Sequence, residues 1–211
     1  MKIKKLLILG IIFVVLGKSE FQYPISWDEL QSDDNWELLK DNKRVKIYNK
    51  DIGVSPLPAF KVELISDVDV DVLVKTAWLV EKSSEIFPNA YIVDAGIYDT
   101  KNDTNYVAFQ LIDIPILSAR LYQFNSILIG NSIHWQKIDT VSQFISNDII
   151  IPPVNFGSWE VQEYGNQSKL IYRVYTDPGG DIPNWIIEKA NQYYLPLMLI
   201  DLENFAKKNI Y

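Results

Sequence analysis

The segment that most constrains the fold of this chain is residues 172–185, near the carboxyl end. The alternation of side chains through 172–176 is typical of a half-buried β-strand. Pro178 fixes its own φ angle, and the two glycines after it can take positive φ, so we expect the strand to end there. Asp181 is a candidate helix N-cap, and Pro183 suits a first helical turn. The segment therefore predicts a strand, a sharp reversal and the start of a helix.

The helix that follows is expected over residues 183–208, which makes it the longest in the chain. At 1.5 Å per residue it would span roughly 40 Å, enough to cross a small domain. Its apolar residues spread more widely than the single stripe of an ordinary surface helix, and Pro196 lies inside it. Because proline removes one backbone hydrogen bond, we expect a bend near the middle. The pattern indicates a helix that a curved structure contacts on more than one side.

Composition limits the classes of function. With 211 residues, 48% of them hydrophobic and 13% aromatic, the chain is long enough for one domain with a large core. A net charge of −7 argues against a nucleic-acid partner, because phosphate binding needs a basic surface. The chain contains no cysteine, which excludes disulfide bonds and thiol chemistry.

The amino end resembles a targeting segment. Three lysines within the first five residues precede an uncharged run at 6–17. A short basic region and an apolar run of about 12 residues fit a secretory signal peptide, whereas a membrane span needs ~20. We therefore expect a signal peptide at 1–19, a ligand-binding domain at 20–211 and an exported protein, either periplasmic or secreted. A short inner-membrane anchor remains an alternative, because no clean small-x-small cleavage pattern is present.

The remaining elements predict an α+β fold with an antiparallel sheet. Helices are expected at 26–41, which begins with a capping box, and at 69–84, with Asp69 as its N-cap. Residues 99–103 and 165–167 have the composition of hairpin turns. Strands are expected at 44–48, 59–65, 91–98, 105–112, 119–129, 132–140, 157–164 and 170–176.

A sheet of about eight antiparallel strands twists and curls. One long helix laid across its concave face leaves a space that is filled either by very large side chains or by a ligand. Ligand pockets commonly form where a curved sheet faces another element, so we expect an internal cavity under the carboxyl-terminal helix.

Several motifs resemble those of the steroidogenic acute regulatory protein-related lipid transfer (START) domains. The closing motif DPGGDIPNW at 177–185, with Pro196 in the helix beyond it, resembles the family's last turn. Residues 36–48, 114–120 and 157–159 resemble earlier family segments in the same order. The resemblance implies the helix-grip fold, a curved antiparallel sheet wrapped around a long carboxyl-terminal helix, and a bacterial exported member of the family.

The resemblance also implies a set of ligand-binding residues. Tyr172 matches a cavity-facing tyrosine, Arg120 matches the arginine of a Pro-x-x-x-Arg-Asp segment, and the following Asp is replaced by Leu121. For each of these side chains a purely structural role stays open at this stage. The implied ligand-binding set is Tyr172, Val174, Arg120, Gln110, Ser84 and Glu85, with Trp185, Ile186 and Leu195 belonging to the helix that acts as a lid.

Catalytic motifs are scarce. His134 is the only histidine, and no nucleophile elbow, phosphate-binding glycine loop or metal-ligand cluster is present. We expect no catalytic residue, no cofactor and no metal.

The sequence thus favours a non-enzymatic, monomeric carrier of one lipid or other hydrophobic ligand, with transient membrane contact and no nucleic-acid partner. Two functions remain as alternatives. One is a cyclase or aromatase that uses the same cavity, and the other is a ligand sensor with a protein partner at the apolar residues 149–153.

Overall fold

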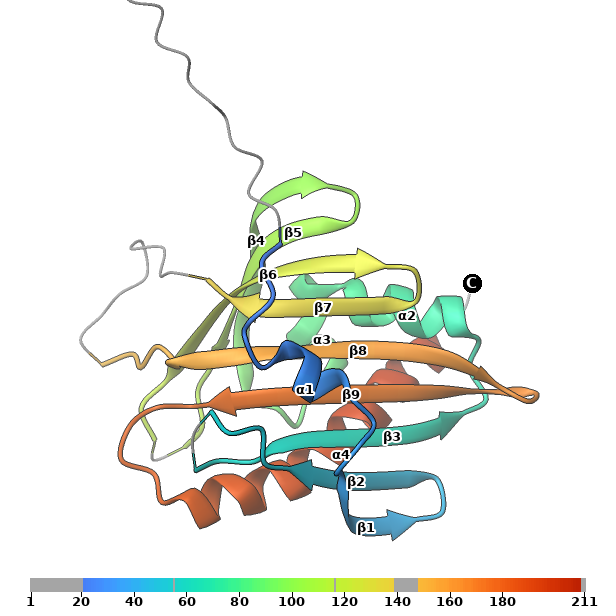
Figure 1. Cartoon of the computed structure of the whole chain (residues 1–211). Coiled ribbons are helices and arrows are strands. Elements are labelled where there is room, and N and C mark those ends of the chain that lie inside the picture. The colour runs from blue at the N-terminus through green and yellow to red at the C-terminus, as the bar shows by residue number, and fades with distance from the viewer. Residues whose placement is uncertain (1–20, 55, 116, 139–147, 210–211) are drawn as a thin grey trace, which may run out of the picture.

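A computed structural model describes residues 21–54, 56–115, 117–138 and 148–209. Within this part, one sheet contains nine strands in the order β1-β2-β3-β9-β8-β7-β6-β5-β4, and every pair of neighbours is antiparallel (Figure 1). The last strand lies in the centre of the sheet, next to β3. The expected signal peptide at 1–19 lies outside the described residues.

The strands are β1 Glu37–Asn42, β2 Val45–Lys50, β3 Ala59–Ser66, β4 Ile92–Asn102, β5 Asn105–Ile112, β6 Arg120–Ile129, β7 Ser132–Lys137, β8 Val154–Tyr164 and β9 Gln167–Asp177. The helices are α1 Trp27–Gln31, α2 Val70–Trp78, the 3₁₀ turn η1 Val80–Lys82, α3 Ser83–Ile86 and α4 Asn184–Lys208.

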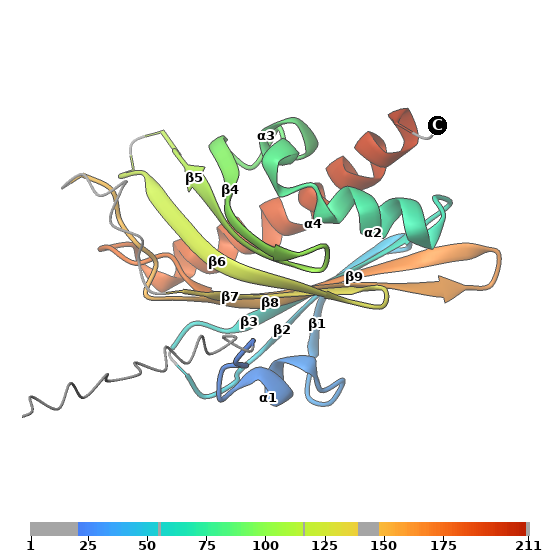
Figure 2. The same ribbon diagram turned by 90° about the horizontal axis from the view of Figure 1, so that it is seen from above.

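The helices divide between the two faces of the sheet (Figure 2). The long α4 crosses the concave face together with α2 and α3, and α1 lies on the opposite, convex face. Strands β4 and β5 curl towards the helices, so the sheet grips α4 from one side. The predicted α+β helix-grip fold is confirmed.

Two helix predictions are wrong in extent. The first helix stops at Gln31, and residues 37–42 form β1, where Leu38 is 50% exposed rather than buried. Asn35 has a φ of 62° just before β1, and Lys43 has a φ of 50° in the turn where β1 reverses to pair with β2. Edge-strand pairing thus overrides the helical periodicity of the segment. The second predicted helix is divided into α2, η1 and α3.

Smaller corrections concern the ends of elements. The residue before α4 is Pro183 rather than Asp181, and its side chain makes no capping hydrogen bond. The first predicted hairpin turn is shorter than 99–103, because β4 continues to Asn102. The predicted strand at 105–112 matches β5, and the other strand predictions lie within a few residues of the observed strands as far as the structure describes them.

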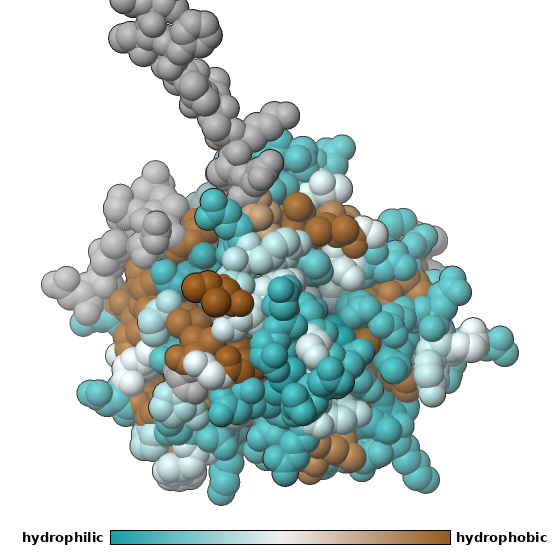
Figure 3. Space-filling view, viewed as in Figure 1, coloured by the Kyte–Doolittle hydropathy of each residue, from teal (hydrophilic) through white to brown (hydrophobic). Residues whose placement is uncertain are grey.

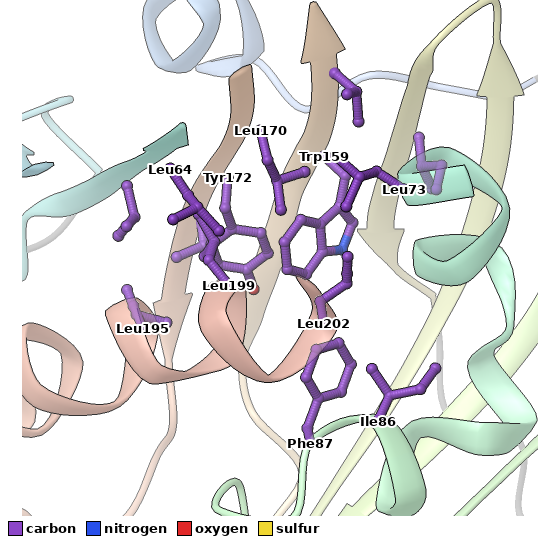
Figure 4. Close-up of a cluster of buried hydrophobic side chains, with 14 of the residues drawn as sticks. Leu64, Leu73, Ile86, Phe87, Trp159, Leu170, Tyr172, Leu195, Leu199 and Leu202 are labelled. Carbon is purple, nitrogen blue, oxygen red and sulfur yellow. The ribbon is translucent and has the colours of Figure 1, made fainter. Parts of the chain in front are cut away.

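The main hydrophobic core fills the space between the concave face and the helices (Figure 4). Trp159 and Tyr172 project from the sheet, and Leu199 and Leu202 of α4 face them. All four side chains are buried. The long helix is therefore part of the core and not only a cover over it.

A smaller cluster on the convex face attaches α1 to the sheet. Trp27 and Leu30 pack with Phe156 and Tyr175. Around this cluster the face that carries α1 is largely hydrophilic, with a hydrophobic patch beside the helix (Figure 3). Ion pairs reinforce the attachment, since the buried Lys50 lies 2.7 Å from Glu29. The two faces of the sheet thus have separate cores.

Candidate ligand pocket

A pocket of about 280 Å³ lies between the concave face of the sheet and α4. Side chains from β4 to β9 form its floor, α2, η1 and α3 close one side, and the first half of α4 covers it. Among the described lining residues, apolar and aromatic side chains predominate.

Aromatic rings form the centre of the floor. The Tyr172 ring stacks on Trp135 with a centroid distance of 5.3 Å and an interplanar angle of 20°. The Tyr172 ring also contacts Trp159, with a centroid distance of 4.2 Å. A Cβ at Gly157 would collide with the Trp135 indole and with the backbone carbonyl of Arg173, so only glycine allows Trp135 to lie flat on the strand. The glycine therefore shapes the floor of the pocket.

The cover of the pocket comes from the turns of α4 nearest its start. Ile186, Ala190, Tyr194 and Leu195 all line the pocket. Tyr194 meets Tyr91, which precedes β4, edge to face with a centroid distance of 6.0 Å. Apart from the buried Leu195, the covering side chains named here are exposed or half-buried, so most of the cover is not tightly packed core.

A hydrogen-bonded pair joins α3 to β5 at the wall. The Gln110 Nε2 group donates to Ser83 Oγ at 2.8 Å, and the Ser83 hydroxyl donates to the Val80 carbonyl at 2.5 Å. Both Gln110 and Ser83 line the pocket. The pair places an amide and a hydroxyl beside the ligand space, and its hydrogen bonds use one N–H of the amide and the hydroxyl proton of Ser83.

More polar groups gather where β6 begins. Arg120 and Tyr122 point to the same side of β6 because they are two residues apart, and Asn155 and Thr176 come from paired positions of β8 and β9. Burial raises the pKa of the Tyr122 hydroxyl, while the nearby Thr176 hydroxyl and the positive charge of Arg120 oppose that rise. The pocket thus has a polar end and an apolar body.

Arg120 is the only charged side chain among the described residues that line the pocket. It is 3% exposed. One guanidinium nitrogen, Nη1, donates to the Ser118 carbonyl, and the buried Nε has no partner. Its Nη2 lies next to the turn at Gly180, where an added Cβ would stand 3.7 Å away.

The structure places the residues implied by the resemblance in two groups. Tyr172, Val174, Gln110, Arg120, Ile186 and Leu195 all line the pocket. Ser84, Glu85 and Trp185 are exposed and do not line it. For the polar contact on α3, the neighbouring Ser83 faces the pocket instead, because Ser84 and Glu85 occupy the solvent side of this short helix.

Sequence reasoning missed several lining residues, including Tyr122, Asn155, Trp135 and Trp159. The period-2 rule could have found Tyr122, because it lies two residues from Arg120 in a predicted strand. Asn155 could not be found in this way, because β8 begins at Val154, whereas the predicted strand begins at residue 157.

His134 does not line the pocket. The Tyr23 hydroxyl lies 3.0 Å from His134 Nδ1, and the imidazole packs against Trp27 on the convex face. Burial lowers the pKa of His134. The histidine is therefore placed to hold the amino-terminal segment on the sheet.

The apolar segment 149–153, proposed above as a surface for a protein partner, is largely packed. Ile150 exchanges backbone hydrogen bonds with Ala119 and Leu121, and its side chain lies against Gly179 and Gly180. Ile149 and Ile151 are half-buried. The segment supports the turn before α4 rather than presenting an open apolar surface.

The described residues contain neither a metal-ligand cluster nor a helix that could span a membrane. No group of three or more acidic, histidine or cysteine side chains is arranged to hold a metal ion in this part of the chain. No described helix has both the length and the apolar character needed to cross a membrane.

The comparisons agree with this fold. No protein-family model matches the chain. The phosphatidylcholine transfer protein of Rattus norvegicus is 24% identical over 200 residues, which cover 82% of this chain and 86% of the rat protein. Human STARD10 has a TM-score of 0.76 at 17% identity, covering 92% of this chain and 84% of that one.

Other solved structures share the fold. The STAR-related lipid transfer protein of Xanthomonas axonopodis has a TM-score of 0.71 at 19% identity, covering 82% of this chain and 99% of that fragment. The Zhui aromatase/cyclase from Streptomyces has a TM-score of 0.55 at 13% identity, and the match covers 72% of this chain and 95% of the Zhui chain. The chain has the helix-grip fold, and the solved structures that share this fold include START and STAR-related lipid transfer domains.

Proposed function

We propose that the protein is a carrier that binds one lipid, or another hydrophobic ligand, in the pocket under α4. The observation that carries this proposal is the character of the pocket, which joins an apolar aromatic body to a small polar end. Each buried methylene contributes about 0.8 kcal/mol, so an acyl chain in this body would bind tightly with few polar contacts. The similarity to proteins named for lipid transfer supports the same proposal.

The pocket offers little for acid–base catalysis, which favours a carrier over a cyclase or aromatase. No Asp, Glu, His or Lys is among its described lining residues. Burial raises the pKa of Tyr106, Tyr122 and Tyr172, so these hydroxyls stay protonated at neutral pH. A general base near neutrality is therefore missing from the described lining, and His134 lies on the other face of the sheet.

Loading a lipid requires the pocket to open. Its volume of about 280 Å³ lies just below the range of roughly 300–1,000 Å³ for ordinary ligand sites. A two-chain lipid would therefore need the first half of α4 to move outward. Trp185 and Tyr193 are 61% and 64% exposed on that half, and we propose that they contact the membrane transiently during loading.

We also propose that the protein acts as a monomer outside the cytoplasm. The basic and then apolar run at residues 2–17 supports export. Amino-terminal sequencing of the protein from its own host would show the loss of about 19 residues. Retention of the segment would favour the membrane anchor instead.

The carrier function is tested by direct binding. Full-length protein stripped of lipid is incubated with a labelled two-chain phospholipid and with a labelled fatty acid, and native mass spectrometry counts the bound ligands. We expect one ligand per chain for at least one of them. The proposal fails if the stripped protein binds neither.

A pair of variants on adjacent residues links binding to the pocket. Ala190→Trp fills space under α4, because Ala190 lines the pocket, and should reduce lipid binding at least tenfold. Lys189→Trp adds the same side chain at an exposed neighbouring position and should leave binding unchanged. Equal effects of both variants would place the ligand elsewhere.

A further inference from the structure

Two arginines of this protein are equally buried but differ in their surroundings. Arg120 and Arg173 are each 3% exposed. Arg173, on the convex face, lies 2.7 Å from Glu160 and 3.3 Å from Asp33. Among the described residues Arg120 has no carboxylate within 4.0 Å, and its guanidinium donates one hydrogen bond there, to the neutral carbonyl of Ser118.

An unpaired buried charge is costly. Arginine cannot lose its proton in a protein, so Arg120 stays cationic wherever it lies. The effective penalty for burying an ion without a partner is several kcal/mol, and folded proteins ordinarily pair such groups. A buried arginine with no acid beside it in the described part of the chain therefore leaves a place for a counter-ion that a ligand can supply.

The position of Arg120 shows where that counter-ion would bind. The guanidinium lines the pocket. Its Nε donor is buried without a partner, but so is that of Arg173, so the difference between the two arginines lies in the carboxylates beside Arg173. Tyr122 and Asn155 line the same polar end.

We propose that the lipid carries an anionic group, a phosphate or a carboxylate, and that Arg120 binds this group inside the pocket. The inference rests on the carrier function proposed above and names the class of its ligand. The planar guanidinium suits both groups, because its N–H donors match two oxygens of a phosphate or a carboxylate. With the anion at Arg120, the acyl chain lies along the aromatic floor formed by Trp135, Trp159 and Tyr172.

Four ligands of similar chain length test this proposal on the full-length protein. Oleate presents a carboxylate, 1-oleoyl lysophosphatidate a phosphate monoester and dioleoyl phosphatidylcholine a phosphate diester, whereas oleyl alcohol is neutral. We expect one or more of the first three to bind about ten- to a hundred-fold more tightly than oleyl alcohol, the range for a charge-assisted pair. The ranking of the three then tells phosphate from carboxylate.

Variants assign the preference to a residue. Arg120→Met should remove the ten- to hundred-fold preference for an anionic ligand over oleyl alcohol, and should keep or raise the melting temperature of the protein without added lipid. Arg173→Met is the matched control, which should lower the melting temperature and keep the preference. Tyr122→Phe should weaken the anionic ligand only a few-fold.

The outcomes separate the two proposals. If oleyl alcohol binds to the wild type as tightly as all three anionic ligands, the inference about Arg120 is wrong, while the carrier function stands. This outcome is measured on the wild type and needs no variant to fold. Unchanged anion preference in Arg120→Met would overturn it as well. If none of the four ligands binds, the carrier function fails and this inference fails with it.

Discussion

The two halves of α4 differ in what holds them. Residues 184–194 contain no buried side chain, although several of them line the pocket. All of the buried positions lie in the second half, at Leu195, Leu199, Leu202, Glu203 and Ala206. One continuous helix is therefore attached firmly at one end and weakly at the other.

The polar contacts show the same difference. Glu203 is buried in the second half, where its carboxylate accepts hydrogen bonds from Arg44 at 2.5 Å and Ser66 at 2.8 Å and lies 3.1 Å from Lys207. The first half meets the rest of the protein mainly through the Tyr91–Tyr194 contact and the apolar side chains over the pocket. The junction of the halves is close to Pro196, whose ring removes one helical hydrogen bond.

This comparison indicates which part of the helix can move. Opening the first half exposes few buried contacts, whereas opening the second half disrupts the core and separates a buried carboxylate from its partners. We infer that 184–194 acts as the lid and 195–208 as the anchor. The predictions below test this difference.

The largest expected effect separates the halves by core truncation. Leu202→Ala should reduce the free energy of unfolding by about 2–5 kcal/mol, because the side chain is fully buried and leaves a cavity. Ile186→Ala, in the lid and 39% exposed, should cost less than about 1 kcal/mol. Urea unfolding measures both, and equal losses would contradict the difference between the halves.

The second expected effect concerns the anchoring carboxylate. Burial raises the pKa of Glu203, but hydrogen bonds from Ser66, Lys207 and Arg44 outweigh this effect and hold the pKa below its ordinary value. Glu203→Gln should therefore reduce stability at pH 7 by about 1–3 kcal/mol. Arg44 limits the loss, because its side chain is 53% exposed and can be rehydrated.

The effect of Glu203→Gln should depend on pH in a defined direction. A group whose pKa is lower in the folded than in the unfolded protein stabilises fully above the unfolded value, and the contribution disappears as the pH falls through the folded value. The stability difference between wild type and variant should thus be largest near pH 7 and shrink in acid. A difference that grows on acidification would show that the carboxylate is not held in its charged form.

The smallest expected effect on stability concerns the junction. Pro196→Ala restores a backbone donor for the helix and should raise stability by about 0.5–2 kcal/mol. If the proline lets the lid move independently of the anchor, the variant should also exchange labelled lipid with vesicles several-fold more slowly. Unchanged exchange, with higher stability, would locate the moving part elsewhere.

Much of the fold follows from local sequence. The alternation at 44–48 predicts β2, because Val45 and Ile47 are buried while Lys46 and Tyr48 between them are half-buried. The proline and glycines at 178–180 end β9 before α4, and both glycines have the positive φ that was expected. The first helix was overestimated because its helical pattern continues into β1, which becomes a strand only by pairing with β2.

The candidate site was predictable in part for a similar reason. Tyr172 and Val174 face the pocket because alternation fixes the face of a strand once its register is known. On α3 the resemblance implied Ser84 or Glu85, whereas Ser83 is the residue that lines the pocket, because the break between α2 and α3 decides which side of the short helix faces inward. No local pattern marks that break.

The sequence by itself determined the helix-grip class, the long terminal helix with its internal proline, and the apolar and aromatic composition of the core. Only the tertiary structure decided that Arg173 is paired with acids while Arg120 is not, and that the two halves of α4 are held differently. Both distinctions depend on which distant residues approach one another, as when Asp33 reaches Arg173 across 140 positions of the chain. Burial and charge pairing are properties of that approach and cannot be obtained from local periodicity.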